Sequence, residues 1–517
     1  MMKVMAAWQV MDGGENTRHA GIATDSCAAA RTGQKWHCRA GRVWCRPMLL
    51  RLSVIAILCG KVLAAAGETH EITVDFAVPA GSLRALHGIN KGPLSANGLV
   101  DLTEEQKRLR IPFTRLHDCH HPNPDVVDIH AVFPNAEADP AMPASYDFRA
   151  TDEYIAAVRA TGAGIIYRLG ESIEHQTVKR HVHPPRDPVR WAAVCAGIVR
   201  HYNAGWANGH HYGIRYWEIW NEPENRPVMW TGDDAQFLEL YKVTSRALRT
   251  EFPEIKIGGV AFGYYGKFDG ADLVPSEFCA AFLDLCQRES LPLDFFSWHC
   301  YTDNPAELAA RARAVRRVLD ARGFNKTESH LNEWNYLPGN SWDVLSRTAA
   351  PEVRQRASEQ MMGAPGGTFL AASLIELQNA PLDVANFYHG ECGNFGLFTE
   401  AGAPTRNYHA LLAFSQMLDT PALVRTGGGV PGKLAVIAGT DAGKTKAALL
   451  IANLSGPAEL RLSPVKFPWA GETEAVVRIV DEKRALEPLP VVKIADSTLV
   501  LHLPPPGVAL VELRPRQ

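Results

Sequence analysis

The chain of 517 residues is predicted to be an α/β protein, a (β/α)8 TIM barrel with an accessory β-sandwich. Three observations predict this fold. Short β-rich runs alternate with longer helical patterns between residues 85 and 390, which is typical of βα units. Polar side chains gather at the ends of those runs, where a barrel of this kind places its active site. Past residue 418 the helical patterns stop and only short β-rich runs remain.

Eight runs are predicted as barrel strands, and seven segments as helices between them. The strands are Ala85–Asn90, Phe113–His117, Gly164–Leu169, Tyr216–Asn221, Ile255–Ala261, Asp294–Tyr301, Ser329–Trp334 and Val384–His389. The helices are Glu104–Arg110, Thr151–Ala160, Pro188–Asn203, Asp234–Glu251, Ser276–Arg288, Ala306–Arg322 and Arg354–Asn379. Such units over about 300 residues are enough to close a barrel.

We therefore expect a catalytic barrel over residues 84–417 and a sandwich formed by residues 68–83 and 418–517. The sandwich strands are expected at Lys433–Ala438, Ala447–Leu454, Ala475–Val480, Thr498–Leu503 and Gly507–Leu513, with Gly, Pro, Asn and Asp between them. The strand-like segment His70–Val78 has no βα partner, so it is also assigned to the sandwich.

Residues 1–66 are predicted to be a leader rather than a domain. The parts of a secretory signal peptide are present: the positive charges of Arg46 and Arg51, the apolar run Leu52–Leu58 and the small residues Ala64–Ala66. Lys61 interrupts the pattern. If the signal is used, translation starts at Met48, and residues 1–47 are a mis-assigned extension. We then expect a secreted or periplasmic protein with no membrane span in its mature form.

Composition argues against several other classes of protein. A formal net charge of −3 gives no long-range attraction to nucleic acid or to acidic membranes. The cysteines after the leader form no Cys-x-x-Cys pair, so neither a zinc site nor a disulfide scaffold is indicated. They are Cys119, Cys195, Cys279, Cys286, Cys300 and Cys392, most of them expected to be buried free thiols. Oligomeric state cannot be predicted from these features.

Two short segments carry the chemistry: Tyr216–Pro223 and His330–Asn335. Each ends an apolar run with a glutamate, Glu222 or Glu333, flanked by asparagine and aromatic residues. Two facing glutamates are the minimum equipment for cutting a glycosidic bond, and no cofactor or metal is needed. The fourth and seventh strands lie opposite one another in a closed barrel, which permits the separation of about 5–5.5 Å that retaining enzymes use.

The two glutamates need different protonation states. Glu222, as the acid/base, has to be protonated near neutral pH, so its pKa should be raised by apolar neighbours and by a second carboxylate. Glu333, as the nucleophile, has to stay ionised, and Arg115 and Tyr301 are the strand-end groups best suited to holding it so. Glu218 lies deeper in its strand and is expected to be structural.

The chain resembles glycoside hydrolase family 39, which contains β-xylosidases and α-L-iduronidases of the retaining (β/α)8 clan. The resemblance covers about residues 85–510 and is carried by the motifs Trp217–Pro223, His299–Tyr301, Asn332–Trp334 and Gly396–Glu400. It implies that Glu222 is the acid/base and Glu333 the nucleophile. It also implies that Asn221 binds the 2-hydroxyl group of the sugar.

Further substrate contacts are expected from His117, His299, Tyr301, Trp334 and Glu391. The segment 115–121 is rich in histidine, and a divalent metal site is the less favoured explanation for it. The favoured one is a pocket wall that hydrogen-bonds sugar hydroxyls.

A substrate that carries a carboxylate would need a cation in the pocket. Lys91 and Arg168 are the two candidates. The leading hypothesis is a retaining, β-xylosidase-like hydrolase acting on a carbohydrate. An α-L-iduronidase-like enzyme, or another glycan hydrolase, is the alternative. A non-catalytic carbohydrate-binding barrel is a third possibility, but such a barrel is expected to have lost one of the two glutamates.

Overall fold

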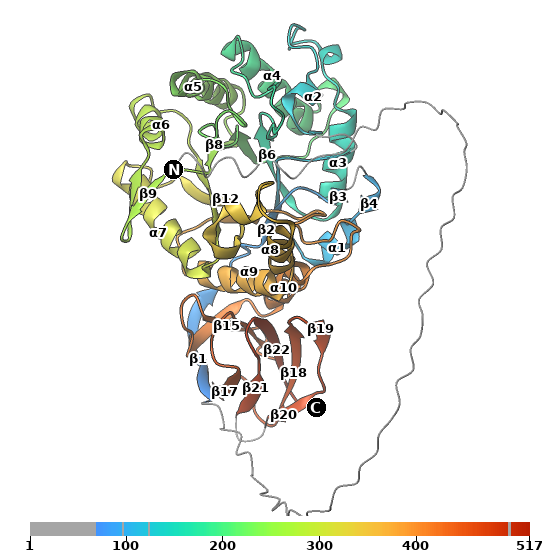
Figure 1. The fold of residues 1–517 in the computed structure, drawn as a ribbon, viewed down its shortest axis with the longest axis vertical. Coiled ribbons are helices and arrows are strands. Elements are labelled where there is room, and N and C mark those ends of the chain that lie inside the picture. Colours follow the sequence, from blue (N-terminus) through green and yellow to red (C-terminus); the bar gives the residue numbers. More distant parts are fainter. Residues whose placement is uncertain (1–68, 96–97, 122–124, 495–497, 517) are drawn as a thin grey trace, which may run out of the picture. The chain divides into compact units, whose positions relative to one another are not determined.

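A closed barrel of eight parallel strands forms the larger part of the computed structural model, which describes residues 69–95, 98–121, 125–494 and 498–516 (Figure 1). The barrel strands, in their order around the barrel, are β2 (Gly88–Asn90), β5 (Phe113–Leu116), β6 (Gly164–Leu169), β7 (Tyr216–Ile219), β8 (Lys256–Phe262), β11 (Phe295–Thr302), β12 (Glu328–Tyr336) and β13 (Val384–Phe387). This confirms the predicted fold class. The predicted leader, with its signal peptide, lies outside the described residues.

Helices follow the strands and surround the barrel (Figure 1). They are α1 (Thr103–Arg108), α2 (Ile129–Val132), α3 (Arg149–Ala160), α4 (Pro188–Ala204), α5 (Asp234–Glu251), α6 (Glu277–Arg288), α7 (Pro305–Ala321), α8 (Pro351–Met362), α9 (Ala364–Leu377) and α10 (Arg406–Gln416). Asp187, Asp233 and Ser276 accept backbone N–H bonds at the starts of α4, α5 and α6, which explains why these helices begin where they do.

One predicted helix is two helices. The segment Arg354–Asn379 is divided between α8 and α9, because Gly363 adopts an extended conformation (φ −87°, ψ −164°). Pro365 then occupies the first turn of α9, where its missing N–H does no harm. The helices α2 and α10 were not predicted.

The second sheet has ten strands in the described part of the chain, in the order β19-β18-β22-β16-β15-β14-β1-β17-β21, with β20 paired to β18. Their bounds are β1 (His70–Ser82), β14 (Ala422–Gly427), β15 (Leu434–Thr440), β16 (Ala447–Asn453), β17 (Glu459–Val465), β18 (Thr473–Val480), β19 (Ala485–Pro488), β20 (Val492–Ile494), β21 (Leu499–His502) and β22 (Gly507–Pro515). The strand β1 lies between β14 and β17, antiparallel to the first and parallel to the second. This mostly antiparallel sheet is the accessory β-sandwich, and four of its strands, β14, β17, β19 and β20, were not predicted.

Shorter elements lie in the connecting segments. They are the hairpins β3 (Leu94–Ser95) with β4 (Val100–Asp101) and β9 (Gly266–Asp269) with β10 (Asp272–Pro275), and the 3-10 helices η3 (Pro143–Ser145), η4 (Trp206–Asn208), η5 (Pro338–Asn340), η6 (Trp342–Leu345) and η7 (Met417–Asp419). Among the described residues, no helix combines the length and apolarity that crossing a bilayer requires.

The barrel and the second sheet share a hydrophobic core. The helix α9 is apolar on nearly all sides and buries residues from Ala364 to Leu377. Its side chains join one cluster with Ile437, Leu450 and Leu510 of the sheet. A separate cluster fills the interior of the sandwich. The six described cysteines are free, and all but Cys392 are buried, as predicted.

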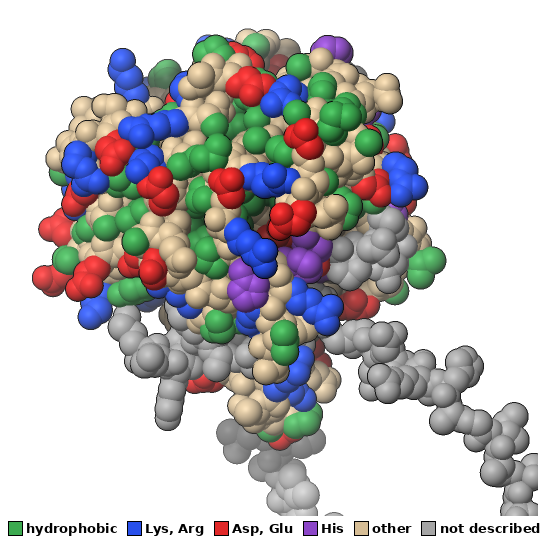
Figure 2. Space-filling view, turned by 90° about the horizontal axis from the view of Figure 1, so that it is seen from above, with side chains coloured by type: hydrophobic (Ala, Val, Ile, Leu, Met, Phe, Trp, Pro, Cys, Tyr) green, Lys and Arg blue, Asp and Glu red, His purple; other side chains and the backbone are tan. Residues whose placement is uncertain are grey.

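The face seen in Figure 2 carries acidic and basic side chains in alternation, with apolar side chains scattered between them. On this face, within the described residues, charges of one sign do not gather into an extended patch. This mixture of charges agrees with the small net charge of the chain.

Candidate active site

A buried arginine, Arg115, forms hydrogen bonds with several side chains at the carboxyl ends of the barrel strands. Arg115, at the end of β5, is fully buried and donates from Nε to Glu218 (2.6 Å) and from Nη1 to Glu333 (2.8 Å). It also donates from Nη1 to Asn90 Oδ1 (3.0 Å) and from Nη2 to Asn221 Oδ1 (2.7 Å). The planar guanidinium thus fixes side chains from three strands or strand ends at once. Burial lowers the pKa of Arg115, but the two carboxylates outweigh it and raise the pKa above its ordinary value.

Glu333 lies within β12 and is held at both of its oxygens. Oε1 accepts the bond from Arg115, and Oε2 accepts one from the hydroxyl of Tyr301 (2.9 Å). Both contacts were predicted from the sequence. Burial raises the pKa of Glu333, while the His299 ring and the Arg115 guanidinium act against that rise. A carboxylate that receives bonds from a cation and from a hydroxyl group is stabilised in its ionised form.

Glu222 follows β7, where the chain leaves the barrel through two left-handed residues, Trp220 (φ 67°) and Glu222 itself (φ 43°). Such backbone conformations are strained for residues other than glycine and are common at functional sites. The Oε2 atom of Glu222 accepts a bond from the amide of Asn225 (2.9 Å). A Cβ atom at Gly263 would lie 2.4 Å from Glu222 Oε1, so a larger residue there would displace the carboxyl group from its position. Burial raises the pKa of Glu222 to about 7.

His299 lies between the two glutamates. Its Nδ1 atom is 2.7 Å from Glu222 Oε1 and 3.5 Å from Glu333 Oε2. One donor or acceptor atom from each of the three side chains lies within 4.8 Å of the others. Burial lowers the pKa of His299 to about 4, so the ring is neutral near neutral pH. The strands β7 and β12 therefore bring the two predicted glutamates together.

Three trios of described residues have atoms spaced closely enough to hold a metal ion. They are Glu222, His299 and Glu333; Asp128, His130 and Glu171; and Asp152, His201 and His210. In the first trio, Arg115 and Tyr301 already bond to both oxygens of Glu333. An acid–base pair fits that arrangement better than a set of metal ligands. The histidine-rich segment 117–121 contributes to none of the three trios found among the described residues.

His117 is buried next to the carboxylates. Its Nε2 atom lies 3.4 Å from Asp118 Oδ1 and 3.9 Å from Glu333 Oε1. Burial lowers the pKa of His117 well below its ordinary value, so this ring is neutral as well. Asp118 in turn accepts a bond from the hydroxyl of Tyr388 (3.0 Å). A neutral imidazole in this place is suited to hydrogen-bond a hydroxyl group.

The two cations considered for a sugar carboxylate are already paired with protein carboxylates. Lys91 Nζ lies 2.6 Å from Glu391 Oε1, and both side chains are buried. Burial raises the pKa of Glu391, but Lys91 and His120 outweigh this and lower it to about 2. Arg168 is fully buried in an ion pair with Asp128.

The prediction that Trp334 contacts substrate is wrong. Its side chain is fully buried and packs on Phe369 of α9 and Phe387 of β13. Neighbouring residues of a strand point to opposite sides. Since Glu333 points into the barrel, Trp334 has to point outward to the helices.

Three residues near the glutamates were not predicted as site residues, although Asn332 belongs to a motif that the sequence singles out. Asn225 binds Glu222, and its position three residues further along the same loop was the available signal. Asn332 donates to Glu218 Oε1 (2.5 Å), which completes the surroundings of that buried carboxylate. Glu224 accepts from the backbone of Tyr264 (2.8 Å), and burial together with Glu222 raises its pKa to about 8.

Known proteins share this architecture and parts of this sequence. A β-xylosidase of Geobacillus stearothermophilus is 25% identical over 324 residues, which cover 56% of this chain and 60% of that protein. A β-xylosidase of Caldicellulosiruptor saccharolyticus is 24% identical over 271 residues, covering 47% of this chain and 48% of that protein. The chain thus matches about half to three-fifths of the length of these curated relatives.

Among solved structures, a glucosidase from Croceicoccus marinus superposes with a TM-score of 0.72 at 24% identity, covering 87% of this chain and 99% of that one. At this identity the likeness establishes the fold alone. The family model described as glycosyl hydrolases family 39 matches residues 145–450, more than half of the chain and a range that contains both glutamates. The chain therefore belongs to glycosyl hydrolases family 39.

Proposed function

We propose that this protein is a retaining glycoside hydrolase in which Glu222 is the acid/base and Glu333 the nucleophile. The observation that carries the proposal is the pair of buried carboxyl groups on facing strands, with oxygens within 4.8 Å of one another and with different bonding partners. Retaining enzymes hold their two carboxyl groups about 5–5.5 Å apart, whereas inverting enzymes leave room for a water between them.

In the first step Glu333 attacks the anomeric carbon while protonated Glu222 gives its proton to the leaving oxygen. The bond to the leaving group breaks, and a glycosyl ester of Glu333 forms. In the second step Glu222, now ionised, takes a proton from water, and that water displaces Glu333 from the sugar. Membership of the family and the raised pKa of Glu222 support these roles.

Asn221 is suited to bind the sugar hydroxyl next to the anomeric carbon. Its Oδ1 atom is taken by Arg115. Its amide NH2 group is then the part that can donate to an acceptor in the substrate. A hydrogen bond to the 2-hydroxyl group that strengthens in the transition state contributes several kcal/mol in such enzymes.

A neutral β-linked pentose is the substrate class that we favour. The two curated relatives are β-xylosidases. In addition, Lys91 and Arg168, the two cations considered for a uronic acid, are paired with Glu391 and Asp128. An α-L-iduronidase-like activity is therefore the less supported candidate. A barrel that only binds carbohydrate would have no need for two carboxyl groups with different protonation states.

The test is hydrolysis of a panel of aryl glycosides by the full chain, followed by NMR of the first-formed sugar. The panel contains a β-xyloside, a β-glucoside, a β-galactoside, an α-arabinoside and an α-iduronide. We expect turnover of the β-xyloside, with the product appearing first as the β-anomer. Appearance of the α-anomer first would refute the double displacement. Turnover of the α-iduronide alone would refute the proposed substrate class. If no member of the panel were hydrolysed, the result would favour a barrel that only binds carbohydrate.

A further inference from the structure

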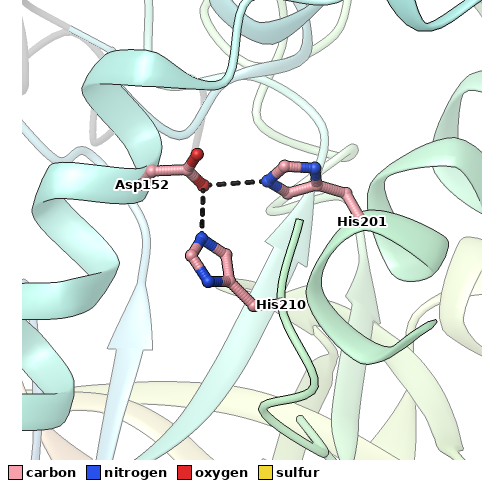
Figure 3. A group of neighbouring side chains, drawn as sticks. All are labelled: Asp152, His201 and His210. Atoms are coloured by element: carbon pink, nitrogen blue, oxygen red, sulfur yellow. Dashed lines mark hydrogen bonds and ion pairs between the residues drawn. The ribbon is translucent and has the colours of Figure 1, made fainter. Parts of the chain in front are cut away.

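A second cluster of ligating side chains lies outside the barrel, between two of its helices. Asp152 belongs to α3 and His201 to α4, and His210 follows in the loop that leads to β7 (Figure 3). The Oδ1 atom of Asp152 is 2.9 Å from His201 Nε2 and 3.4 Å from His210 Nε2. One such atom from each residue lies within 4.8 Å of the other two. The three side chains converge on one point, as Figure 3 shows.

The other ring nitrogen of His201 is fixed by the backbone. His201 Nδ1 lies 3.0 Å from the carbonyl oxygen of Trp206. A carbonyl can only accept, so Nδ1 carries the proton in this bond. His201 Nε2 makes a hydrogen bond of 2.9 Å with Asp152 Oδ1, and a bound metal ion would take the place of the proton in that bond. A histidine that donates one N–H group to a carbonyl and offers its other nitrogen is the usual arrangement of a histidine bound to metal.

His210 adds a ring nitrogen that makes no hydrogen bond in the described part of the chain. This Nε2 atom is buried and faces Asp152. The backbone around it is tied to α4: His210 N–H donates to His201 O (2.6 Å), and His210 O accepts from Gly205 N–H (2.9 Å). The ring also stacks on Tyr212, with centroids 4.3 Å apart. The imidazole is therefore held in place before any ligand binds.

The charge at this cluster differs from that at the Asp128, His130 and Glu171 trio. There, Arg168 already pairs with Asp128. Among the described residues, Asp152 forms ion pairs with His201 and His210 only, and no lysine or arginine partners it. One carboxylate and two imidazole nitrogens thus meet without a basic side chain among them, a donor set that suits a divalent cation.

A path from solvent exists. A cavity of about 660 Å³ opens beside the cluster and is lined by Asp152, His201, Tyr146 and Asn208 among others. The side chains of Asp152 and His210 are each 30% exposed, whereas that of His201 is 1% exposed. An ion can therefore enter from one side, and water can fill the coordination position that the protein leaves open.

We propose that Asp152, His201 and His210 bind one divalent transition-metal ion of the Zn²⁺ class. Ligand bonds of about 2.0–2.1 Å in a tetrahedral site place donor atoms roughly 3.3 Å apart, close to the distances of 2.9 and 3.4 Å between Asp152 Oδ1 and the two imidazole nitrogens. Two imidazoles and one carboxylate suit Zn²⁺, Co²⁺ or Ni²⁺, whereas Ca²⁺ and Mg²⁺ prefer oxygen ligands alone. The ion joins α3, α4 and the loop before β7. It is separate from the proposed hydrolysis and takes no part in it.

The test uses the full, tag-free chain after removal of metal by a chelator. Zn²⁺ is titrated by calorimetry, and Co²⁺ by its visible absorption, into the wild type, His210→Ala and the control His211→Ala. His211 is the exposed neighbouring histidine and does not belong to the trio. We expect His210→Ala to bind one ion fewer, or the same ion at least about tenfold more weakly. His211→Ala should bind like the wild type.

Thermal unfolding separates a metal site from a simple hydrogen-bonded cluster. Bound Zn²⁺ should raise the Tm of the wild type and of His211→Ala, but not that of His210→Ala or Asp152→Asn. A role of His210 in folding alone would lower the Tm of His210→Ala without metal and leave the response to metal unchanged. The proposal is overturned if the wild type binds no Zn²⁺, or if His210→Ala matches the wild type in stoichiometry and affinity.

Discussion

Glu222 and Glu333 lie at the same end of the same barrel and are both buried, yet their surroundings differ. Glu333 receives a bond from a guanidinium at one oxygen and from a hydroxyl group at the other. Glu222 has an amide and a neutral imidazole as its partners. Burial is the largest cause that raises the pKa of both. The difference teaches that two buried carboxyl groups are distinguished by their bonding partners, since bonds from a guanidinium and a hydroxyl group favour the ionised form of Glu333.

The backbone positions of Glu222 and Glu333 also differ. Glu333 is inside β12, paired in register with His299 of β11, so the strand ladder fixes it. Glu222 lies beyond the end of β7 with a φ of 43°. A group that has to attack one atom benefits from a rigid strand, whereas a group that passes a proton back and forth tolerates a loop position.

The largest effect is expected from Glu333→Gln. In the proposed mechanism it removes the nucleophile while leaving shape and hydrogen bonding nearly intact, so kcat should fall about 10⁴-fold or more. The matched control is Glu328→Gln on the same strand, where Glu328 pairs with Lys256 at the opposite end of the barrel. Hydrolysis of the aryl glycoside that the wild type turns over measures both. Equal losses of kcat in the two variants would contradict the assignment of Glu333 as the nucleophile.

Glu222→Gln should have the next largest effect, a loss of about 10²–10⁴-fold with poor leaving groups. The pKa of Glu222 is about 7, so the wild-type kcat/KM should fall as the pH rises through about 7, where the proton needed by the leaving oxygen is lost. That alkaline limb should be absent in the variant. A variant that keeps the limb would assign it to another group, such as Glu224.

The same substitution should affect stability with a defined sign. Folding raises the pKa of Glu222 from 4.5 to about 7, so its contribution to stability is present below 4.5 and is lost as the pH rises through 7. The loss amounts to about 3 kcal/mol in full. Glu222→Gln should therefore match the wild type in Tm at pH 4 and exceed it at pH 9.

The barrel could be predicted from the sequence because its signals are local. A buried parallel strand is an apolar run with a polar residue at its end, and each of the eight expected runs contains an observed strand or overlaps one closely. The division at Gly363 was missed because the surrounding residues favour helix and only Gly-Ala-Pro interrupts them. The strand β17 was missed because it contains Pro464.

The main residues of the candidate site could be predicted from the sequence, but the hydrogen bonds between them could not. Each of Glu222, Glu333, Arg115 and Tyr301 lies at or near the carboxyl end of a predicted strand, so their meeting follows from the closed barrel. That Arg115 bonds to four side chains depends on the register between strands and on rotamers, which no local pattern reports. Trp334 is different, since strand alternation already indicated that it could not share a face with Glu333.

A milder substitution weakens the cation beside Glu333 without removing its charge. Arg115→Lys keeps a positive group but cannot reach four acceptors, so kcat should fall about 10- to 10²-fold. The pKa of Glu333 should rise, which moves the acidic limb of kcat/KM to higher pH. Arg168→Lys is the matched control, because Arg168 is an equally buried barrel arginine that pairs with Asp128 instead. It should lower the Tm but leave the acidic limb in place.

The smallest effects are expected from the loss of single hydrogen bonds, one to Glu333 and one to Glu222. Tyr301→Phe removes the hydroxyl bond to Glu333, so we expect a loss of about tenfold in kcat and a shift of the acidic limb to higher pH. Asn225→Leu removes the amide that lowers the pKa of Glu222, so the alkaline limb should move to higher pH while the acidic limb stays. Complete pH profiles of kcat/KM measure both variants. If each variant moved both limbs equally, the two carboxyl groups would titrate as one unit, and the distinction between their surroundings would fail.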